Sequence, residues 1–326
     1  MTGLLLLTCN SRSATVSVHA YDTARGQVRH LRDVPLPVSS GETNAAPMTL
    51  GAGGTRVYLA WRGAEKRLFA FALDRKTGAL ILLQDHAIGV DVCFLHAPGD
   101  GTRLLAASGD TVQEFLLDRE GRVAQTMTPL PLGPMAHCAI ADSLGRIYAT
   151  ACRGDLVRSF TVDSGLVHVE DIPQPAGSGP RHLCLSPDGT SLYLVTQESG
   201  EVVVFSTTGG LREIQRLVMV EGAAAPMGGD IGVTPDGRFV YATERSTNQV
   251  VGFAVDDGRL RRIGAAPVAD YPRALGIGGG GAFLVVLGFR GHRADIFGIA
   301  ENGSLTPIAD YETGERPSWV LAVDAA

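Results

Sequence analysis

The apolar residues of this chain fall in short runs separated by glycine-containing turns, and one arrangement of them recurs six times. Each copy has an apolar strand, a turn and a second strand that ends in small or polar residues, as in LCLSPDGTSLYLVTQES and IGVTPDGRFVYATERST. Two further strand-like runs follow each hairpin, such as EVVVFSTT and LREIQRLVMV. Short strands joined by tight turns, without sustained helical periodicity, predict an all-β protein.

The spacing of the turn glycines indicates how these units are organised. Successive intervals are 47, 44, 44, 48 and 44 residues, measured from Gly54 through Gly101, Gly145, Gly189 and Gly237 to Gly281. Such a period is typical of a four-stranded propeller blade. The chain ends can supply a seventh blade, with SWVLAVD as the inner strand beside LLLLTCN and TVSVHAYD. We therefore expect a single domain over residues 1–326: a seven-bladed β-propeller, four antiparallel strands per blade, closed by N- and C-terminal strands.

Counting from the turn glycines places long polar side chains at one mouth of the central channel. The first strand of a blade lines the channel, and residues equally far from a hairpin turn meet at one rim. Seven polar residues stand eight positions from a turn glycine, where some other blades carry small or apolar residues: Arg62, His137, Arg153, Arg181, Gln197, Arg245 and Arg273. The hairpin that contains Arg153 is one residue shorter than the others, so its place is displaced by one. Three consecutive blades supply the candidate catalytic set, which is His137, Arg181, Gln197 and Arg245. Arg62 and Arg273 are candidate substrate-binding residues, and the alternative is that such arginines only hydrogen-bond loop carbonyls.

Neighbours of these residues add further candidates. His182 and Glu198 each follow a residue expected to face the channel, so alternation along the strand should turn them away from it. We expect His182 to be a packing residue, and Glu198 either to pair with Arg181 or to meet solvent. Glu244 is either the ion-pair partner of Arg245 or a second channel carboxylate. Glu198 and Glu244 are kept as candidate substrate-binding residues.

Composition and charge exclude several classes of protein. The 326 residues carry a formal net charge of -6 with scattered Lys and Arg, which argues against a nucleic-acid partner. The opening MTGLLLL has no basic flank, and no apolar run approaches the roughly 18 residues of a membrane helix. Five cysteines without CxxC spacing indicate neither a disulfide framework nor a zinc site. We therefore expect a soluble cytoplasmic protein with reduced thiols and no membrane contact.

Motifs of other enzyme classes offer no competing hypothesis. The chain contains no GxSxG, GxxxxGKS, HExxH or EF-hand pattern, and its eight histidines are dispersed. The glycine-rich GIGGGGAF at 276–283 coincides with a hairpin turn of the repeat, which indicates a tight turn and not a phosphate-binding loop. We therefore expect no cofactor and no metal site.

Several segments resemble the seven-bladed propeller lactonases, which include bacterial 6-phosphogluconolactonases and fungal carboxymuconate-lactonising enzymes. The similar segments are PMAHCAIADSLGRIYA, GPRHLCLSPDGTSLYLVTQESGEVVVF, DIGVTPDGRFVYATERSTNQVVGFAVDDGRL and YPRALGIGGGGAF. The resemblance covers nearly the whole chain and is closest over 134–317. The family's site has a His at the start of an inner strand, an Arg in GPRH, a Glu and a second Arg. By resemblance these positions are His137, Arg181 and Arg245, with Gln197 where the family has Glu.

The resemblance implies a metal-independent lactone hydrolase for a small anionic or sugar-type lactone. His137 would be the general base, because an ordinary histidine pKa lies near neutrality. Arg181 and Arg245 would hold a phosphate or carboxylate or face the developing oxyanion, and Gln197 would orient water or ring hydroxyls. This chain departs from its relatives at Glu244, Met135 and Leu287-Gly288. Two alternatives stay open: a cycloisomerase of the carboxymuconate type, and a non-catalytic propeller that binds a small anion or a partner protein. We expect a monomer or a weak homo-oligomer.

Overall fold

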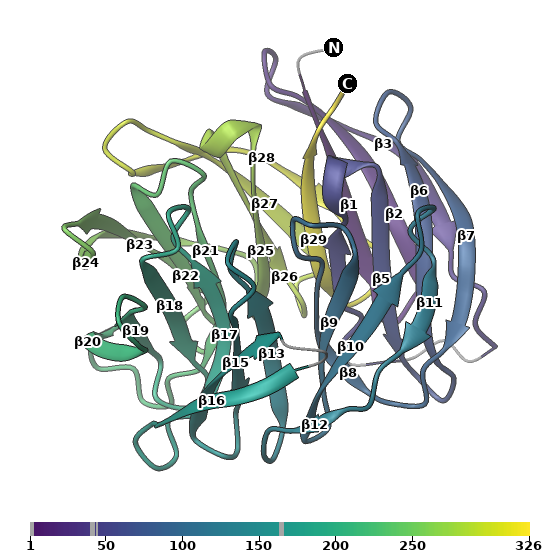
Figure 1. Cartoon of the computed structure of the whole chain (residues 1–326). Helices are drawn as coiled ribbons and strands as arrows, with labels where there is room; N and C mark the ends of the chain where they lie inside the picture. The colour runs from purple at the N-terminus through teal and green to yellow at the C-terminus, as the bar shows by residue number, and fades with distance from the viewer. Residues whose placement is uncertain (1–2, 40–42, 44, 163–165) are drawn as a thin grey trace.

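The computed structural model describes residues 3–39, 43, 45–162 and 166–326, and its strands form seven antiparallel sheets (Figure 1). One sheet joins both ends of the chain and comprises β29 (Pro317–Asp324), β1 (Gly3–Asn10), β2 (Thr15–Asp22) and β3 (Gln27–Pro35). The next three sheets comprise β4 (Met48–Leu50), β5 (Arg56–Arg62), β6 (Lys66–Asp74) and β7 (Ala79–Ala87); β8 (Val92–His96), β9 (Arg103–Ser108), β10 (Thr111–Leu117), β11 (Val123–Thr126) and β12 (Leu130–Pro131); and β13 (Ala136–Ala141), β14 (Ile147–Ala151), β15 (Leu156–Val162) and β16 (Leu166–Pro173). The last three comprise β17 (Pro180–Leu185), β18 (Ser191–Thr196), β19 (Glu201–Ser206) and β20 (Arg212–Val218); β21 (Gly228–Val233), β22 (Phe239–Glu244), β23 (Gln249–Asp256) and β24 (Arg259–Pro267); and β25 (Pro272–Gly278), β26 (Phe283–Gly288), β27 (Arg293–Ile299) and β28 (Leu305–Glu312).

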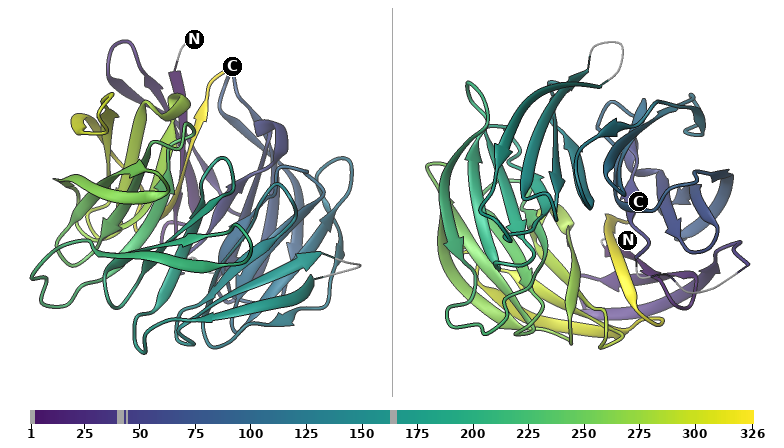
Figure 2. Two further views of the ribbon diagram at one scale, coloured as in Figure 1. Left: turned by 60° about the vertical axis from the view of Figure 1, so that its left-hand side comes forward. Right: turned by 90° about the horizontal axis from the view of Figure 1, so that it is seen from below.

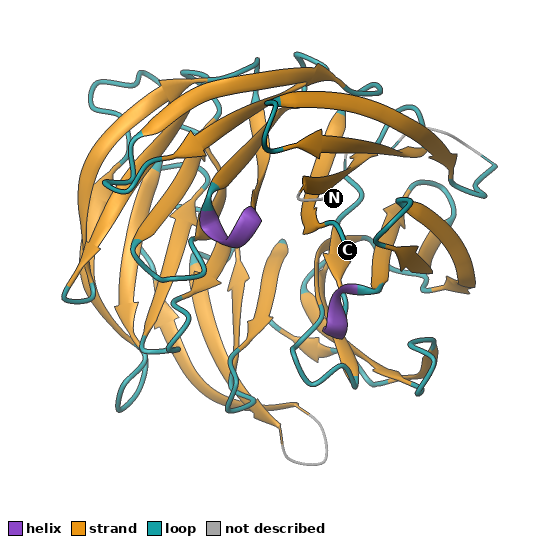
Figure 3. Cartoon of the chain, turned by 90° about the horizontal axis from the view of Figure 1, so that it is seen from above, coloured by secondary structure: helices purple, strands orange, loops and turns teal. Residues whose placement is uncertain are grey.

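These sheets confirm the predicted seven-bladed propeller. The inner strands contact one another in succession around a ring, in the order β29, β4, β8, β13, β17, β21, β25 and back to β29. The ring is closed by β1, which pairs with β29 from Leu4↔Asp324 to Asn10↔Pro317 (Figure 2). The view from above shows the sheets arranged around a common axis (Figure 3). The N- and C-terminal strands therefore close the propeller as the sequence predicts.

The turn glycines that define the repeat have a backbone reason to be glycine. All six have positive φ, from 67° at Gly54 to 98° at Gly281, a region in which a side chain would be strained. The first and last of these turns contain short 3-10 segments, η1 (Ala52–Gly54) and η2 (Gly279–Gly281). Within the described ranges, no helix is long and apolar enough to cross a membrane.

One blade departs from four continuous strands. Its outer edge is split into β11 and β12, and both of these short strands pair with β10. Pro129 lies between the two pieces and has no N–H to donate to the neighbouring strand. The interruption therefore falls at a residue that cannot continue the ladder.

The apolar core consists of layers between neighbouring sheets. In the layer beside the closing sheet, Leu5 and Leu7 of β1 belong to one buried cluster with Val57, Leu59 and Trp61 of β5. Strand alternation explains this, because residues two apart along each strand share one face. Every blade therefore packs against a neighbour on each side, and the ring has no open end.

A β-bulge recurs near the start of the inner strands. The pairing register to the second strand, or to β1 in the closing blade, shifts in six of the seven sheets. In four of them the unpaired residue stands eight positions before the turn glycine of its blade: Cys93, His137, Arg181 and Arg273. A bulge leaves one residue outside the ladder and redirects its side chain. Simple alternation therefore does not describe the rim of the channel.

Because the closed ring buries β1 between two sheets, we expect two leucines of different burial to differ strongly in their contribution to the free energy of unfolding. Leu7 on β1 is fully buried between the closing sheet and its neighbour, whereas Leu82 on β7 is 44% exposed. We expect Leu7→Ala to lower the free energy of unfolding by about 2 to 5 kcal/mol, because it leaves a cavity. Leu82→Ala should stay within about 0.5 kcal/mol of wild type. Urea denaturation measures both, and equal effects would contradict the closed-ring packing.

Candidate functional site

A cavity of about 390 Å³ lies where the bulged ends of the inner strands meet. Six of the seven blades contribute to its wall, which leaves the closing blade as the exception. Its polar and charged lining residues are Arg62, Asp91, Cys93, His137, Gln197, Arg245 and Arg273. Five of these seven are residues that the sequence had selected. Counting from the turn glycines therefore leads to side chains that share one hollow.

The backbone at this rim is held in an uncommon conformation. Met135 and Tyr271 each stand two residues before a bulged residue and have φ of 59°. Arg316 has φ of 53°, and Gly179 occupies the corresponding place before Arg181 with φ of 67°. A left-handed backbone is strained for residues other than glycine and persists only where the surroundings enforce it. Here the conformation aims Met135 at the cavity and Tyr271 at Arg245.

Arg181 does not line the cavity but lies buried directly behind its wall. Its side chain is 2% exposed, and its Nε donates to Gln197 Oε1 at 3.3 Å. Its Nη1 donates to the carbonyl of Gly229 and lies 3.1 Å from the ring of His182. Arg181 therefore reaches the cavity through Gln197.

Arg245 is fixed at the cavity by a carbonyl and an aromatic residue. Its Nη2 donates to the Gly228 carbonyl at 2.6 Å, and its Nη1 donates to the Tyr271 hydroxyl at 3.2 Å. The guanidinium carbon also lies 5.2 Å from the centre of the Tyr271 ring. Arg273 similarly lies 5.1 Å from the ring of Phe289. Aromatic rings thus orient two cations of the site without neutralising them.

The arginines crowd together without carboxylate partners. None of the ion pairs between described residues includes Arg62, Arg181, Arg245 or Arg273, while Asp91 of the cavity wall pairs with Lys66. Burial, then Arg245 and Arg273, lowers the pKa of Arg181 well below its usual value. Burial, then Arg245, lowers the pKa of Arg273 to about 10. Such a cluster favours an anionic ligand, which would supply the missing counter-charge.

His137 is the buried imidazole of the cavity. It is 5% exposed, and its Nδ1 has no hydrogen-bond partner in the described structure. Burial, then Arg181, His182 and Arg273, lowers its pKa well below 6.5. The expectation of an ordinary histidine pKa is therefore wrong, because burial and nearby cations disfavour the imidazolium. At neutral pH His137 is an uncharged proton acceptor.

Gln197 and Glu198 lie in the turn after β18, and the structure corrects the prediction for Glu198. The strand ends at Thr196, so alternation no longer separates the two side chains. Gln197 Nε2 donates to Glu198 Oε1 at 2.6 Å, and Glu198 is exposed. Glu198 therefore meets solvent, as one of the two expectations had it, but it also contacts Gln197 and does not face away.

Glu244 is placed differently from both alternatives offered by the sequence. It is fully buried at the end of β22, and its carboxylate accepts hydrogen bonds from the backbone N–H groups of Met227 and Thr247. The hydroxyls of Ser246 and Thr247 also donate to it. Glu244 thus closes the loop after its strand, where it is neither an ion-pair partner of Arg245 nor a residue of the cavity wall.

His182 is a packing residue, as expected, but it also has a polar role that the sequence did not indicate. Its ring lies 5.0 Å from the rings of Phe94 and His137 and 5.7 Å from that of Trp319. Its Nδ1 is 2.7 Å from Asp230 Oδ1. The bulge at Arg181 explains why these two adjacent side chains touch although strand alternation would separate them.

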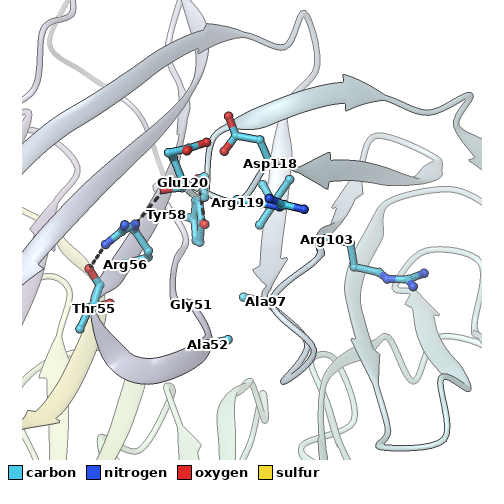
Figure 4. A pocket seen from close by; sticks show the side chains of 13 residues that line it. Gly51, Ala52, Thr55, Arg56, Tyr58, Ala97, Arg103, Asp118, Arg119 and Glu120 are labelled. Atoms are coloured by element: carbon cyan, nitrogen blue, oxygen red, sulfur yellow. Dashed lines mark hydrogen bonds between the residues drawn. The ribbon is translucent and has the colours of Figure 1, made fainter.

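A second cavity, of about 220 Å³, lies beside η1 and the β10–β11 turn (Figure 4). Most of its long polar side chains have partners within the protein. Arg56 donates to the carbonyls of Glu120 and Thr55, and Tyr58 donates to that of Gly121. Arg103 pairs with Glu114. Among the described residues, Arg119 lines this cavity without an ion-pair or hydrogen-bond partner, but it is a single exposed cation and not a cluster like that of the channel cavity.

No metal-binding cluster was found in the part of the chain that the structure describes. Three or more His, Cys, Asp or Glu side chains do not converge there in a way that could hold an ion. Cys93 faces the channel cavity, but burial raises the pKa of its thiol, which keeps it protonated.

Comparison of the sequence with known proteins identifies relatives with the same architecture. The family model of the lactonase, 7-bladed beta-propeller, matches residues 5–322. A 6-phosphogluconolactonase of Sodalis glossinidius is 30% identical over 235 residues, which cover 68% of this chain and 71% of the relative. That of Pectobacterium carotovorum is 26% identical over 320 residues, which cover 92% and 94%.

Solved structures of similar fold include lactonases as well. A candidate 6-phosphogluconolactonase from Bacteroides uniformis superposes with a TM-score of 0.88 at 26% identity, covering 99% of this chain and 100% of that one. A periplasmic gluconolactonase from Pseudomonas aeruginosa has a TM-score of 0.86 at 22% identity over the full length of both chains, which supports the fold alone. The chain belongs to the lactonase family of seven-bladed β-propellers.

Proposed function

We propose that this protein is a hydrolase for a small anionic lactone of the 6-phosphogluconolactone type, and that the channel cavity is its active site. The observation that carries the proposal is a buried neutral imidazole, His137, among arginines without carboxylate partners. Relatives described as 6-phosphogluconolactonases support the choice of substrate class. The cavity volume of about 390 Å³ suits a substrate of sugar size.

The proposed reaction divides the work between His137 and the arginines. Water attacks the lactone carbonyl while His137 accepts a proton from it, and the carbonyl oxygen becomes anionic. Arg245 stabilises that oxyanion as the tetrahedral intermediate forms. The ring C–O bond then breaks, and the imidazolium returns its proton to the departing oxygen to give the open-chain hydroxy acid. A bound anion also helps by offsetting the cations that lower the His137 pKa.

The remaining arginines account for the substrate's charge. Arg62 and Arg273 come from blades that lie three and two places around the ring from the one that supplies Gln197, so an anionic group away from the lactone carbonyl can be held on that side of the cavity. Arg181 supports the wall from behind through Gln197. Gln197 presents an amide to the cavity, where it can orient water or a ring hydroxyl.

The same arrangement supports a second candidate function. Arginines on several blades could hold the two carboxylates of a muconate-type substrate, and the site would then catalyse lactone formation by cycloisomerisation.

One panel of substrates separates the two functions from simple anion binding. It contains phosphorylated aldonolactones, neutral aldonolactones and muconolactones, and the reaction is monitored by acid release and by ring absorbance at neutral pH. Acid release from a phosphorylated lactone supports the hydrolase. No turnover with any compound, despite binding of inorganic phosphate, would leave an anion-binding propeller.

We further propose that the enzyme works in the cytoplasm without a metal ion, as a monomer or weak homo-oligomer. All five cysteines are free, which suits a reducing compartment. Activity should survive dialysis against EDTA, and size-exclusion chromatography with light scattering measures the mass. A loss of activity that Zn²⁺ or Ca²⁺ restores would contradict the metal-independent mechanism.

Removal of the proposed base should affect turnover and spare binding. We expect His137→Ala to lower kcat on the order of 10²-fold or more with little change in KM, because the general base is lost while the arginines stay. His168→Ala is the matched control, since that side chain is 52% exposed and pairs with Asp171. Steady-state kinetics on the best lactone of the panel decides this. A His137 variant with wild-type kcat would remove His137 from the mechanism.

Removal of an arginine should affect anionic substrates selectively. We expect Arg273→Ala to raise KM for a phosphorylated lactone by about 10- to 100-fold, the range for one charge-assisted hydrogen bond. KM for the neutral lactone should change little, and Arg212→Ala, at an exposed position on β20, should change neither. Equal losses on charged and neutral lactones would indicate a structural role for Arg273.

Restoring the family's carboxylate at position 197 tests the charge of the cavity. Gln197→Glu keeps an oxygen that can accept from Arg181, but it replaces the hydrogen bond to Glu198 with a negative charge that faces another carboxylate. We expect KM for a phosphorylated lactone to rise about tenfold, the effect of one repulsive charge roughly 10 Å away in a partly buried site. Glu198→Gln should shift KM in the opposite direction by a smaller factor, because Glu198 is exposed. A lower KM for Gln197→Glu would show that the amide does not serve anion binding.

A further inference from the structure

A buried carboxylate, Asp230, lies behind the cavity and joins three consecutive inner strands. It is 7% exposed on β21, and its Oδ1 accepts a hydrogen bond from Nδ1 of His182 on β17 at 2.7 Å. Its Oδ2 accepts one from the backbone N–H of Leu275 on β25 at 3.0 Å, and its Oδ1 also accepts the N–H of Ile231 at 2.9 Å. The position of this carboxylate is therefore fixed from three directions.

The hydrogen bond to Asp230 sets the tautomer of His182. When Nδ1–H donates to the carboxylate, the lone pair of Nε2 is left free to accept. Arg181 Nη1 lies 3.1 Å from both ring nitrogens, and only Nε2 can accept its proton. Burial, then Arg181 and Arg273, lowers the His182 pKa well below 6.5, so the ring is neutral and the contact with Asp230 is a hydrogen bond to a carboxylate.

The same direction of donation continues to the cavity wall. Arg181 has only donors, so its Nε–H requires the oxygen of the Gln197 amide, at 3.3 Å. The amide nitrogen of Gln197 must then point the other way, and it donates to Glu198 at 2.6 Å. The amide oxygen of Gln197 therefore faces Arg181, and its amide nitrogen faces Glu198. Asp230 contributes to this arrangement by holding His182 in the tautomer that can accept from Arg181.

Asp230 is also the carboxylate that offsets the charge of Arg181. The pKa of Arg181 is lowered by burial, Arg245 and Arg273, and Asp230 acts in the opposite direction. Burial raises the pKa of Asp230 itself to about 6. The titratable and charged groups that face it are, from β17 and β13, His182, Arg181, Cys184 and Cys138.

We propose that Asp230, acting through His182, is a positioning residue that orients Arg181 and Gln197 at the cavity wall and supplies their counter-charge. The inference rests on the proposed function in one respect: the effect on turnover presupposes that the cavity is a lactonase site. A purely structural Asp230 would affect stability alone, since the His182 ring also packs against Phe94 and Trp319.

The kinetic test uses Asp230→Asn, with Glu114→Gln as a matched control. Glu114 is another buried carboxylate; it lies on β10, outside the cavity wall, and pairs with Arg103. We expect Asp230→Asn to lower kcat on the order of 10²-fold, the usual result of misplaced catalytic groups, and to change KM by less than about threefold. Glu114→Gln should leave both constants unchanged. Unaltered kcat and KM in a folded Asp230→Asn protein would overturn the proposal.

The pH profile gives a readout that a structural role would not alter. Below a pH of about 6 the Asp230 carboxylate is protonated in the folded protein and its charge is lost, so wild-type kcat should fall as the pH drops through that value. Asp230→Asn should lack this limb. A lactone that bears a carboxylate is the substrate, because a phosphate monoester itself titrates near 6. An acid limb centred near pH 6 that persists in the variant would contradict the proposal, whereas a limb at lower pH reports protonation of His137.

A double-variant cycle tests the route through His182. Asp230→Asn, His182→Gln and the double variant should lose similar factors in kcat, because all of them interrupt one chain of hydrogen bonds. Multiplicative losses would show two independent roles and overturn the proposal. Should Asp230→Asn not fold, as judged by circular dichroism, the expected loss in His182→Gln carries the kinetic test.

An NMR measurement on the full chain separates this proposal from the proposed function. In protein labelled with ¹⁵N-histidine at pH 7.5, His182 should carry its proton on Nδ1 and have a bare Nε2. A proton on Nε2 would overturn the positioning role even if the protein hydrolyses lactones. The expected tautomer in a protein that hydrolyses none would support the network and contradict the lactonase hypothesis.

Discussion

The pairing of β1 with β29 is the constraint on which the rest of the structure depends. It joins the two ends of the chain in one sheet, so each inner strand has a neighbouring blade on both sides and the ring has no open end. The circumference of the channel is then fixed by seven sheets packed through apolar layers. Side chains that point into the channel cannot move apart to lower their mutual repulsion. Closure of the ring therefore holds arginines from different blades close together, and their positive charges add up in the channel.

Within that ring, the recurrent β-bulge decides which side chains enter the channel. A regular strand would bury one neighbour and expose the next, but the bulges at His137, Arg181 and Arg273 remove one residue from the ladder at equivalent places. The repeat supplies the position, and each blade fills it differently: with a thiol, an imidazole or a guanidinium. The same β-bulge, occupied by different side chains in different blades, thus produces an asymmetric site in a repetitive fold.

The electrostatics of the site depend on which groups lie close to each arginine. Arg181 is buried and has Asp230 as its offsetting carboxylate at a distance, whereas Arg245 and Arg273 are oriented by aromatic rings that leave their charge intact. His137 is held neutral by the same cations. An anionic substrate would improve the balance for all of them at once, since its charge lies among the arginines and favours proton uptake by the imidazole. Substrate binding and base strength are coupled in such a site.

The sequence by itself determined the propeller, because the spacing of its turn glycines reflects the length of a blade and each of these glycines has a backbone that a side chain would strain. It also located Arg62, His137, Gln197, Arg245 and Arg273, since residues equally far from a turn reach one rim. Only the tertiary structure decided which groups these side chains contact. Glu198 touches Gln197 because its strand has already ended, Glu244 closes a loop, and Arg181 meets His182 across a bulge. Asp230 gave no signal in the sequence, and its role arises from strands about 45 residues apart that pack side by side in the ring. Periodicity records distances along the chain, whereas hydrogen bonds, burial and pKa depend on distances between blades.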